Sequence, residues 1–397
     1  MKILCITKHF YPENFRINDF LFKLKKKGHQ ITVFTNKPIY PYNHKYNYNS
    51  KFKTRIKGVN VYRIPVIYFG DNIFSKLSYF LSFIINVSLV GLFLLIKKRF
   101  DTIFVFAPSP PTVVIPGIFL SKIKKIPCTI WLHDVWPESL GLLGYKKSNL
   151  IYILISKFMT KIYQNCLGIF TQSKSLKEHI LKLKVNKNVF YLPVHAETTY
   201  LNLPKKNNNK KFKIYFFGNI GLAQDIPSVL KTIEILKNDK NIEWIFVGEG
   251  KMKNWLKEKI KQKKLDKNVT LKSMVRLNKV SLYYKDADAL LVSLKKDKCF
   301  NLILPAKVQG YLASGVPIFS MGNGETYLTT KSASCGIYCE GGNYKKFAKL
   351  IHNFKRLDFK KRKKIGYNGY KYYLKHFDIS KVLKVFEESI NKIISLN

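Results

Sequence analysis

A lysine near the start of a predicted helix is the residue whose position most directly suggests chemistry. Pro305 suits the first turn of a helix and Gly315 its end, so the segment between them is expected to be helical. Lys307 then lies in the first turn, where the helix dipole already contributes partial positive charge. A cation is favourable there if an anion such as a diphosphate binds beside it. A lysine that points into solvent is the alternative, and spacing alone does not choose between the two.

Two glycine-containing turns could bring backbone amides close to the same anion. Gly218, Asn219 and Gly221 follow one predicted strand and precede a helix, and Gly248 ends the next strand, in VGEGK. Glycine lets the backbone approach a diphosphate closely, and the helix start that follows adds N–H donors. An ordinary strand–helix turn that needs glycine explains either loop equally well.

A histidine and an aspartate follow a third predicted strand, in the sequence HDVWPE. His133 and Asp134 would then project from the carboxyl end of that strand, where parallel sheets bind their ligands. Glu138, close by, makes the segment more polar and favours a functional site. A lone histidine is more often structural, and that alternative stays open.

The elements that must position these residues alternate between strand and helix signals in both halves of the chain. This order, with short connections, predicts parallel sheets covered by helices. In the first half we expect a helix over Asn18–Lys27 and strands at Ile3–Thr7, Gln30–Thr35, Val59–Ile64, Thr102–Phe106 and Cys128–Leu132. In the second half we expect a helix over Pro227–Lys237 and strands at Lys213–Phe217, Glu243–Val247, Val269–Leu271, Ala289–Leu294 and Pro317–Ser320. The fold class predicted is α/β, with two Rossmann-like, doubly wound domains and a ligand cleft between them.

The polar stretch KKNNNKK, without periodicity, marks the expected boundary between the domains. We therefore expect an N-terminal domain over residues 1–203, a linker over 204–211 and a C-terminal domain over 212–376. A final helix over 377–397 has room to return to the first domain.

The composition is strongly basic, with a net charge of +46 from 70 Lys+Arg against 24 Asp+Glu. The lysines spread over the whole chain, and no zinc-finger, RNA-recognition or helix-turn-helix pattern stands out, so nucleic acid is not expected as a partner. A basic surface still attracts anionic lipid head groups and diphosphates. The six cysteines have no metal-ligand spacing, so no metal site is expected. The N-terminus resembles a first strand rather than a signal peptide, which favours a cytoplasmic protein.

One apolar segment, Ile73–Ile96, contains a single charge, Lys76, and is long enough to cross a bilayer. Serine and asparagine residues interrupt it, and it falls between two strands that should belong to one sheet. A true span would place those strands on opposite sides of the membrane. The alternatives are a helix that lies in the membrane interface and a buried helix pair.

An ordered series of motifs resembles glycosyltransferase family 4, and within it the WbuB-like bacterial transferases of surface-polysaccharide assembly. The motifs run almost from end to end: YPENFRIND, GHQITVFTNKPIYP, HDVWPESL, FGNIGLAQD, VGEG, DADALLVSL, LPAKVQGYLASGVPI and GNGE. The resemblance implies a GT-B fold, a nucleotide-sugar donor, retaining transfer and no required metal or other cofactor. It also implies an acceptor carried on a polyprenyl diphosphate at the inner membrane face.

The same resemblance implies roles for individual residues. The first domain would bind the acceptor and the second the nucleotide sugar. His133 would lie beside the transferred sugar with Asp134 as its catalytic neighbour, and Met274 would lie near the base. The expected donor-binding residues are Gly218, Asn219, Gly221, Gly248, Met274, Pro305, Lys307 and Gln309.

Two departures from the family pattern bear on these roles. Many relatives carry two glutamates in the last motif, the second of which contacts the ribose, whereas this chain has Gly310 at that place. The usual glycine pair of the first loop is replaced by Asn14, Phe15 and Arg16. Arg16 and Asn14 are therefore candidates for contacting the acceptor phosphate or the donor.

The function expected is transfer of a sugar from a UDP-linked donor to a lipid-linked saccharide in O-antigen or capsule assembly, by an enzyme peripheral on the inner face of the cell membrane. The candidates for the transferred sugar are an N-acetylated amino sugar and a deoxy sugar. The alternatives are a GT-B epimerase that acts on the nucleotide sugar itself, and a non-catalytic basic protein that binds a membrane surface or nucleic acid.

Overall fold

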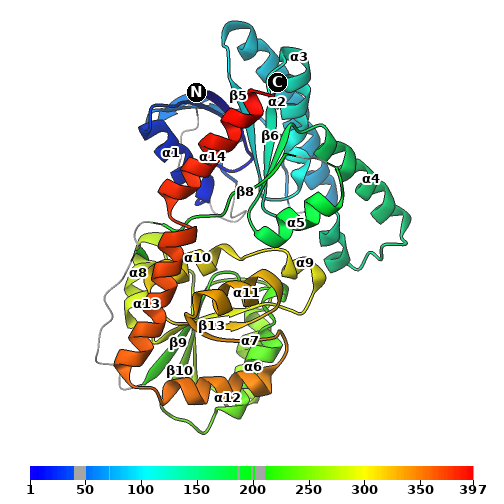
Figure 1. Ribbon diagram of the computed structural model, residues 1–397. Helices are drawn as coiled ribbons and strands as arrows, with labels where there is room; N and C mark the ends of the chain where they lie inside the picture. Colours follow the sequence, from blue (N-terminus) through cyan, green and yellow to red (C-terminus); the bar gives the residue numbers. More distant parts are fainter. Residues whose placement is uncertain (40–50, 71, 186–187, 198–199, 202–210, 397) are drawn as a thin grey trace. The chain divides into compact units, whose positions relative to one another are not determined.

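The structure is a computed structural model that describes residues 1–39, 51–70, 72–185, 188–197, 200–201 and 211–396 (Figure 1). The chain divides into two compact units. Unit 1 comprises residues 1–193 together with 379–397, and unit 2 comprises residues 194–378. The expected linker, 204–211, lies outside the described residues except for Lys211.

Unit 1 is built on an eight-stranded sheet that is parallel except at one edge, where β3 runs antiparallel to β4. Its central strands are buried along almost their whole length, as in sheets covered by helices on both faces. In order across the sheet, the strands are β3 (Lys53–Ile56), β4 (Val59–Arg63), β2 (Gln30–Thr35), β1 (Lys2–Ile6), β5 (Thr102–Ala107), β6 (Cys128–Leu132), β7 (Gly168–Thr171) and β8 (Val189–Tyr191).

Three strands of this sheet were not expected from the sequence. β3 alternates exposed and half-buried residues at the sheet edge, so it lacks the apolar run of a central strand. It pairs with β4 through a two-residue turn, Lys57 and Gly58, whose φ angles of 47° and 82° match the twist that tight hairpins require. The other two, β7 and β8, have four and three residues, too few for a periodic signal.

The helices of unit 1 cover both faces of this sheet. They are α1 (Arg16–Lys26), α2 (Ile73–Lys97), α3 (Ile115–Lys124), α4 (Leu150–Gln164), α5 (Lys174–Lys182) and α14 (Ile379–Ile394), with short 3-10 helices η1 (Pro111–Val114) and η2 (Glu138–Leu143). Figure 1 shows α14, in red, beside α1, in blue. Phe386 of α14 is fully buried against Phe20 and Phe104, and Glu387 forms ion pairs with Lys27 and His29.

The apolar segment forms one continuous helix, α2, with two different faces. On one face, Tyr79, Phe83 and Val87 are buried, and the Tyr79 hydroxyl donates to Asn36 Oδ1 at 2.9 Å. The other face exposes large apolar side chains about every four residues. These are Ile73, Leu77, Leu81, Ile85, Leu89, Phe93 and Ile96. The expectation of a buried helix pair is therefore wrong, because the helix is single and its second face leaves large apolar side chains exposed.

Unit 2 is a six-stranded parallel sheet. In order across it, the strands are β11 (Val269–Lys272), β10 (Ile242–Val247), β9 (Phe212–Phe217), β12 (Ala289–Ser293), β13 (Ile318–Met321) and β14 (Gly336–Cys339). Its helices are α6 (Ile226–Ile235), α7 (Lys253–Gln262), α8 (Leu277–Asp286), α9 (Lys298–Asn301), α10 (Ala306–Ser314), α11 (Gly324–Ala333), α12 (Tyr344–Lys355) and α13 (Phe359–His376), with the 3-10 helix η4 (Leu222–Gln224).

Side chains along β9 point alternately to the two faces of the sheet, so this strand contributes to both hydrophobic cores of unit 2. Ile214 and Phe216 enter one core with residues of α6, α7 and α12, while Tyr215 and Phe217 enter the other with residues of α8, α10 and α13. Both sheets therefore have helices on two faces. The expected fold class, α/β with two Rossmann-like parallel-sheet units, is confirmed.

Candidate functional site

The strand order of each sheet identifies where a ligand should bind. In unit 2 the order reverses between β9 and β12, and in unit 1 it reverses between β1 and β5. Open parallel sheets bind ligands outside the carboxyl ends of the strands at such a reversal. Gly218 directly follows β9, whereas Lys8 and Ser109 lie two residues beyond the ends of β1 and β5.

In unit 2, hydrogen bonds join the loop after β9 to the loop after β10. Gly218 N donates to Val247 O at 3.0 Å, Ile220 N donates to Glu249 O at 2.8 Å, and Met252 N donates to Ile220 O at 2.9 Å. The two glycine turns that the sequence identified separately are therefore one structural feature.

Close approach between these loops explains two of their glycines. A Cβ on Gly248 would lie 1.9 Å from Gly218 O, and one on Gly250 would lie 2.4 Å from Ile220 O. Gly248 is also buried, so its lack of a side chain serves loop packing, and the structure does not support it as a donor contact. Gly221 is buried as well, with the Asn219 amide beside it. Gly218 and Asn219 are exposed in the first turn, as are Glu249 and Gly250 in the second.

Lys307 belongs to this feature although it comes from another helix. α10 begins after Pro305 and ends at Gly315, whose φ of 71° suits a helix end, as expected from the sequence. The Lys307 ammonium lies 3.1 Å from Gln224 Oε1 and 3.9 Å from the centre of the Phe216 ring. A Cβ on Gly218 would be 3.8 Å from Lys307 Nζ. The alternative of a lysine that points into solvent is therefore wrong.

The Lys307 ammonium lacks a compensating negative charge. Burial lowers its pKa to about 7, and no carboxylate among the described residues counteracts this effect. Its neighbours are a neutral amide and an aromatic face. A partly dehydrated cation at a helix N-terminus attracts an anion strongly, because both the charge and the dipole favour one.

The remaining expected donor residues differ in how much of their surface is exposed to solvent. Met274 is 66% exposed in the loop after β11, and its backbone N–H donates to the Glu249 carboxylate, which places it beside the VGEG turn. Gln309 has no exposed surface, so the structure does not support it as a donor contact. Gly310 lies against the Tyr200 ring, 3.3 Å from where its Cβ would be, so tyrosine packing occupies the space of a longer side chain.

In unit 1, His133 follows β6 between two aromatic rings. The centres of the Phe106 and Trp131 rings lie 4.5 and 4.6 Å from the His133 ring centre. Burial lowers the pKa of His133 to about 3, so the imidazole is neutral at physiological pH. Its Nε2 is buried and has no hydrogen-bond partner within the described parts of the chain. A neutral imidazole of this kind can donate a hydrogen bond to a ligand or accept one from it, but it carries no charge.

Asp134 belongs to a cluster with Lys8 and Ser109. Burial raises the pKa of Asp134, while a hydrogen bond from the Ser109 side chain and the charge of Lys8 oppose that rise. Burial lowers the pKa of Lys8 to about 8 against the opposing charges of Asp134 and Glu13, and the Lys8 ammonium donates to Ser109 O. Sequence reasoning missed Lys8 and Ser109. Their positions just beyond the two strands at the reversal are the signal that identifies them.

Arg16 and Asn14 lie on the loop after β1, at the same sheet edge as Lys8. Glu13 is almost fully buried and organises this loop, because its carboxylate accepts hydrogen bonds from His9 Nδ1 at 3.1 Å and from Ile39 N at 2.9 Å. Asn14 is exposed, and Arg16 is half-buried as the first residue of α1.

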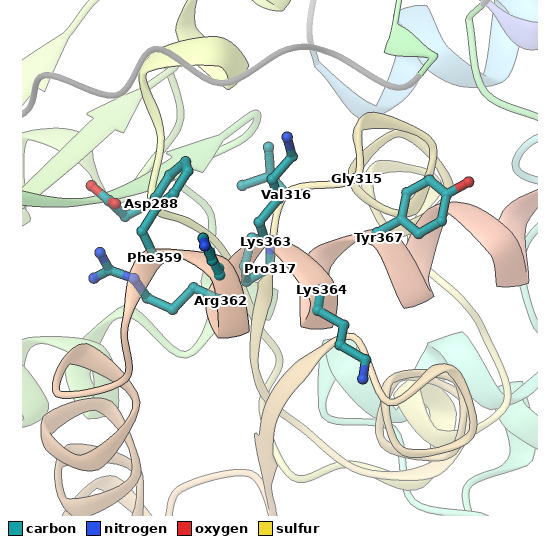
Figure 2. A pocket seen from close by; sticks show the side chains of 10 residues that line it. Asp288, Gly315, Val316, Pro317, Phe359, Arg362, Lys363, Lys364 and Tyr367 are labelled. Atoms are coloured by element: carbon teal, nitrogen blue, oxygen red, sulfur yellow. The ribbon is translucent and has the colours of Figure 1, made fainter.

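A pocket of about 380 Å³ opens at the other end of unit 2's sheet, before β12 and β13 (Figure 2). It is lined by Asp288, Gly315–Pro317 and the first turns of α13. Figure 2 shows Arg362 and Lys364 extending in different directions, so these cations do not converge on one point. The lining contains none of the site residues expected from the sequence.

Comparison with known proteins agrees with this geometry. The family model described as "Glycosyl transferases group 1" matches residues 201–372. A probable glycosyltransferase of Pseudomonas aeruginosa, WbjE, is 25% identical over 259 residues, which span 61% of this chain and 61% of that protein.

Two solved structures cover almost the whole chain. Sucrose-phosphate synthase of Thermosynechococcus elongatus has a TM-score of 0.78 at 12% identity and covers 100% of both chains. HepE of Anabaena, solved in complex with UDP and glucose, has a TM-score of 0.68 at 13% identity over 99% of this chain and 100% of that one. The chain therefore has the GT-B glycosyltransferase fold, and its residues 201–372 match the glycosyl transferases group 1 family.

Proposed function

We propose that the protein is a glycosyltransferase that moves a sugar from a nucleotide diphosphate donor, UDP-linked, to a lipid-linked saccharide. The observation that carries this proposal is Lys307, an uncompensated cation beside the exposed Gly218 at the strand reversal of unit 2. A diphosphate matches this combination of ammonium, helix N-terminus and glycine loop. The Anabaena protein of the same fold was solved with UDP and glucose, which supports the choice of donor.

The physical task of the site is to stabilise the diphosphate as it leaves. When the bond between the anomeric carbon and the phosphate oxygen breaks, negative charge grows on the diphosphate. The Lys307 ammonium and the first N–H groups of α10 are fixed in place before this happens, so they can stabilise the charge without reorganising. The proposed mechanism assigns this role to the protein's own groups and requires no metal.

Retention of configuration follows if the acceptor attacks on the face from which the diphosphate departs. The acceptor hydroxyl oxygen then bonds to the anomeric carbon, and its proton passes to the departing phosphate oxygen. In this scheme His133 stays neutral and hydrogen-bonds to the transferred sugar, because a group with a pKa of about 3 is not a general acid at neutral pH. Asp134, restrained by Lys8 and Ser109, supports the same loop.

We propose further that the protein is cytoplasmic and binds the inner membrane surface through α2. By length and composition α2 is the one helix of the described residues that could cross a membrane. However, two of its serines bond to the segment that precedes the helix. Ser75 and Ser82 accept hydrogen bonds from the backbone N–H groups of Phe69 and Ile67, each at 2.9 Å. A helix held in this way, with one apolar face exposed, suits the membrane interface better than a span.

Vesicle flotation tests the membrane proposal. The double variant Leu81→Asp with Ile85→Asp should weaken binding to vesicles of anionic phospholipid by about tenfold or more, since each residue loses its apolar contact. Leu282→Asp with Leu328→Asp is the matched control, because these two leucines are exposed to a similar extent but belong to unit 2. Equal flotation of the two double variants would disprove the role of α2.

Turnover of defined nucleotide sugars with a lipid-linked saccharide tests the transferase. Lys307→Met and His133→Ala should both lose activity, and unchanged turnover in both would disprove the site assignment. Epimerisation is the rival activity, and product analysis without acceptor separates it from transfer. Under the proposal, the sugar is an N-acetylated amino sugar or a deoxy sugar, and the product enters O-antigen or capsule assembly, as the WbuB-like resemblance implies.

A further inference from the structure

A second pocket lies in unit 1 beside the loop that carries His133 and Asp134. Its volume is about 370 Å³, within the range of small-molecule sites. It is lined by the start of η2, by one face of α4 and by Leu183 after α5. The residues of this lining with polar side-chain groups are Glu138, Lys147, Tyr152, Ser156, Lys157, Thr160 and Tyr163.

A series of hydrogen bonds connects this pocket to the Asp134 cluster. The Ser109 side chain bonds to Asp134, and Trp136 Nε1 donates to Ser109 Oγ at 3.2 Å. The Tyr163 hydroxyl, in the pocket lining, donates to Trp136 O at 2.9 Å. Hydrogen bonds therefore connect the pocket to the loop that carries the predicted catalytic residues.

The chemistry of the pocket combines one fixed carboxylate with cations. Glu138 Oε1 lies 2.7 Å from His179 Nε2, while its Oε2 is buried and has no hydrogen-bond partner within the described parts of the chain. Burial acts to raise the pKa of Glu138, but the hydrogen bond and charge of His179, together with Lys147, hold it below its usual value. Glu138 is therefore ionised and suited to accept a hydrogen bond from a hydroxyl, whereas Lys147 and Lys157 offer ammonium groups to phosphate oxygens.

An apolar strip of α4 continues from the pocket. Leu150, Leu154 and Phe158 are 68%, 56% and 44% exposed, and their spacing of four residues places them on one face of the helix. Lys157, which lines the pocket, is three residues from Leu154, a spacing that makes the two side chains neighbours on a helix. Cations and hydroxyls beside an uncovered apolar strip match an amphiphile that carries a phosphate next to a hydrocarbon chain.

We propose that this pocket and strip form the acceptor subsite, which binds the phosphate-bearing head of a lipid-linked saccharide and the first part of its hydrocarbon chain. Lys147 and Lys157 contact the phosphate, Glu138 accepts a hydrogen bond from a sugar hydroxyl, and Leu150, Leu154 and Phe158 contact the chain. The inference rests on the proposed transferase function, which it extends by assigning a site to the acceptor.

Titration with farnesyl diphosphate, in physiological salt and without any donor, tests this site. Lys157→Ala should weaken binding by about tenfold, because it removes one charge-assisted hydrogen bond. Lys161→Ala is the matched control, since Lys161 is exposed on the same helix but does not line the pocket. It should change the dissociation constant by less than about twofold. Equal dissociation constants for the two variants would overturn the proposal.

Transfer kinetics and vesicle binding distinguish this acceptor subsite from the alternatives. In the transfer reaction, Lys157→Ala should raise KM for the lipid-linked acceptor and leave KM for the nucleotide sugar unchanged. If transfer proceeds with both constants unchanged, the acceptor subsite is wrong while the transferase stands. If farnesyl diphosphate binding depends on Lys157 but no sugar is transferred, the transferase is wrong while the lipid phosphate site stands. If Lys157→Ala weakens binding only to phosphatidylglycerol vesicles, the strip is a membrane contact, and the proposal fails.

Discussion

Each unit has a lysine near the strands where its strand order reverses, Lys8 just after β1 and Lys307 beside Gly218, and burial lowers the pKa of both. Their surroundings differ. Lys8 has Asp134 and Glu13 to offset its charge, and its pKa is about 8. Lys307 has a glutamine amide and the face of Phe216, and its pKa is about 7.

This difference separates an internally balanced charge from one that needs a ligand. The Lys8 cluster has its own negative groups, so it can keep its arrangement whether or not a substrate is present. The Lys307 ammonium is costly to bury alone, and a diphosphate would relieve that cost on binding. Unit 2 is therefore prepared electrostatically for an anion, whereas unit 1 presents a neutral imidazole and a compensated ion cluster.

The largest effect should come from removing the Lys307 charge. Lys307→Met should lower turnover by about 100-fold or more, since one preorganised charge opposite a leaving group contributes on that scale. Lys331→Met, at an exposed position of α11, is the control and should retain activity. Steady-state rates with the nucleotide-sugar donor give the measurement, and a loss below about threefold would remove Lys307 from the diphosphate site.

The same substitution should stabilise the protein. The folded pKa of Lys307, about 7, lies below the unfolded value near 10.5, so the unfolded chain binds more protons between these pH values. The free-energy cost of burying the charged ammonium applies in full below pH 7 and falls as the pH rises above 7. Lys307→Met should therefore raise Tm by a few degrees at pH 6, and by less at pH 9. A lower Tm at pH 6 would show that the ammonium is compensated after all.

The second effect concerns the pH dependence of donor binding. The protonated ammonium binds the diphosphate, and in the free protein it titrates near pH 7. The dissociation constant for a nucleotide sugar should therefore rise by up to about tenfold per pH unit between pH 7 and 9, with uptake of one proton on binding. Calorimetry in buffers of different ionisation enthalpy measures both quantities. Lys307→Met should abolish this slope, and an unchanged slope in the variant would assign it to another group.

A smaller effect is expected at Lys8, because its charge is shared. Lys8→Met leaves Asp134 without its cation and should destabilise the fold by about 1–3 kcal/mol. Adding Asp134→Asn should recover part of that loss, since the buried carboxylate is then also gone. Chemical denaturation of the two single variants and the double variant measures the coupling. Additive losses would show that the two groups do not interact.

The smallest expected effect is that the His133 imidazole does not titrate. With a pKa of about 3, His133 should stay neutral from pH 9 down to pH 5, so its ring proton resonances should not shift over that range. Nuclear magnetic resonance spectra compared with those of His133→Gln identify its signals. A midpoint near pH 6 would show that His133 is hydrated and that the two units are less different than the structure indicates.

Prediction from the sequence succeeded where the signal was local. The strands expected at Gln30–Thr35 and Cys128–Leu132 match β2 and β6 residue for residue, because runs of buried β-branched and aromatic residues specify central strands. The bounds of α10 also followed from Pro305 and Gly315. Sequence reasoning did not find the short strands β7 and β8, since three or four residues are too few for a period to emerge.

The candidate site was predicted less completely than the fold. Lys307 and Gly218 were identified, but Gln224, which contacts the Lys307 ammonium, was not. Gln309 was assigned to the donor and proves to have no exposed surface, because side-chain burial depends on what packs against the helix. Gly248 was assigned for its chemistry, whereas its lack of a Cβ is required by Gly218 O of the neighbouring loop.

By itself the sequence determined the alternation of strands and helices, the helix start that carries Lys307 and the excess of lysine over acid. The first two properties depend on backbone geometry over a few residues, and the third is a property of the composition of the whole chain. Only the tertiary structure decided which charges are compensated. Lys8, Ser109 and Asp134 meet across more than 100 residues of sequence, and Lys307 meets Gln224 from 83 residues away. Burial and Coulomb energies depend on distance in space, and strand order sets that distance.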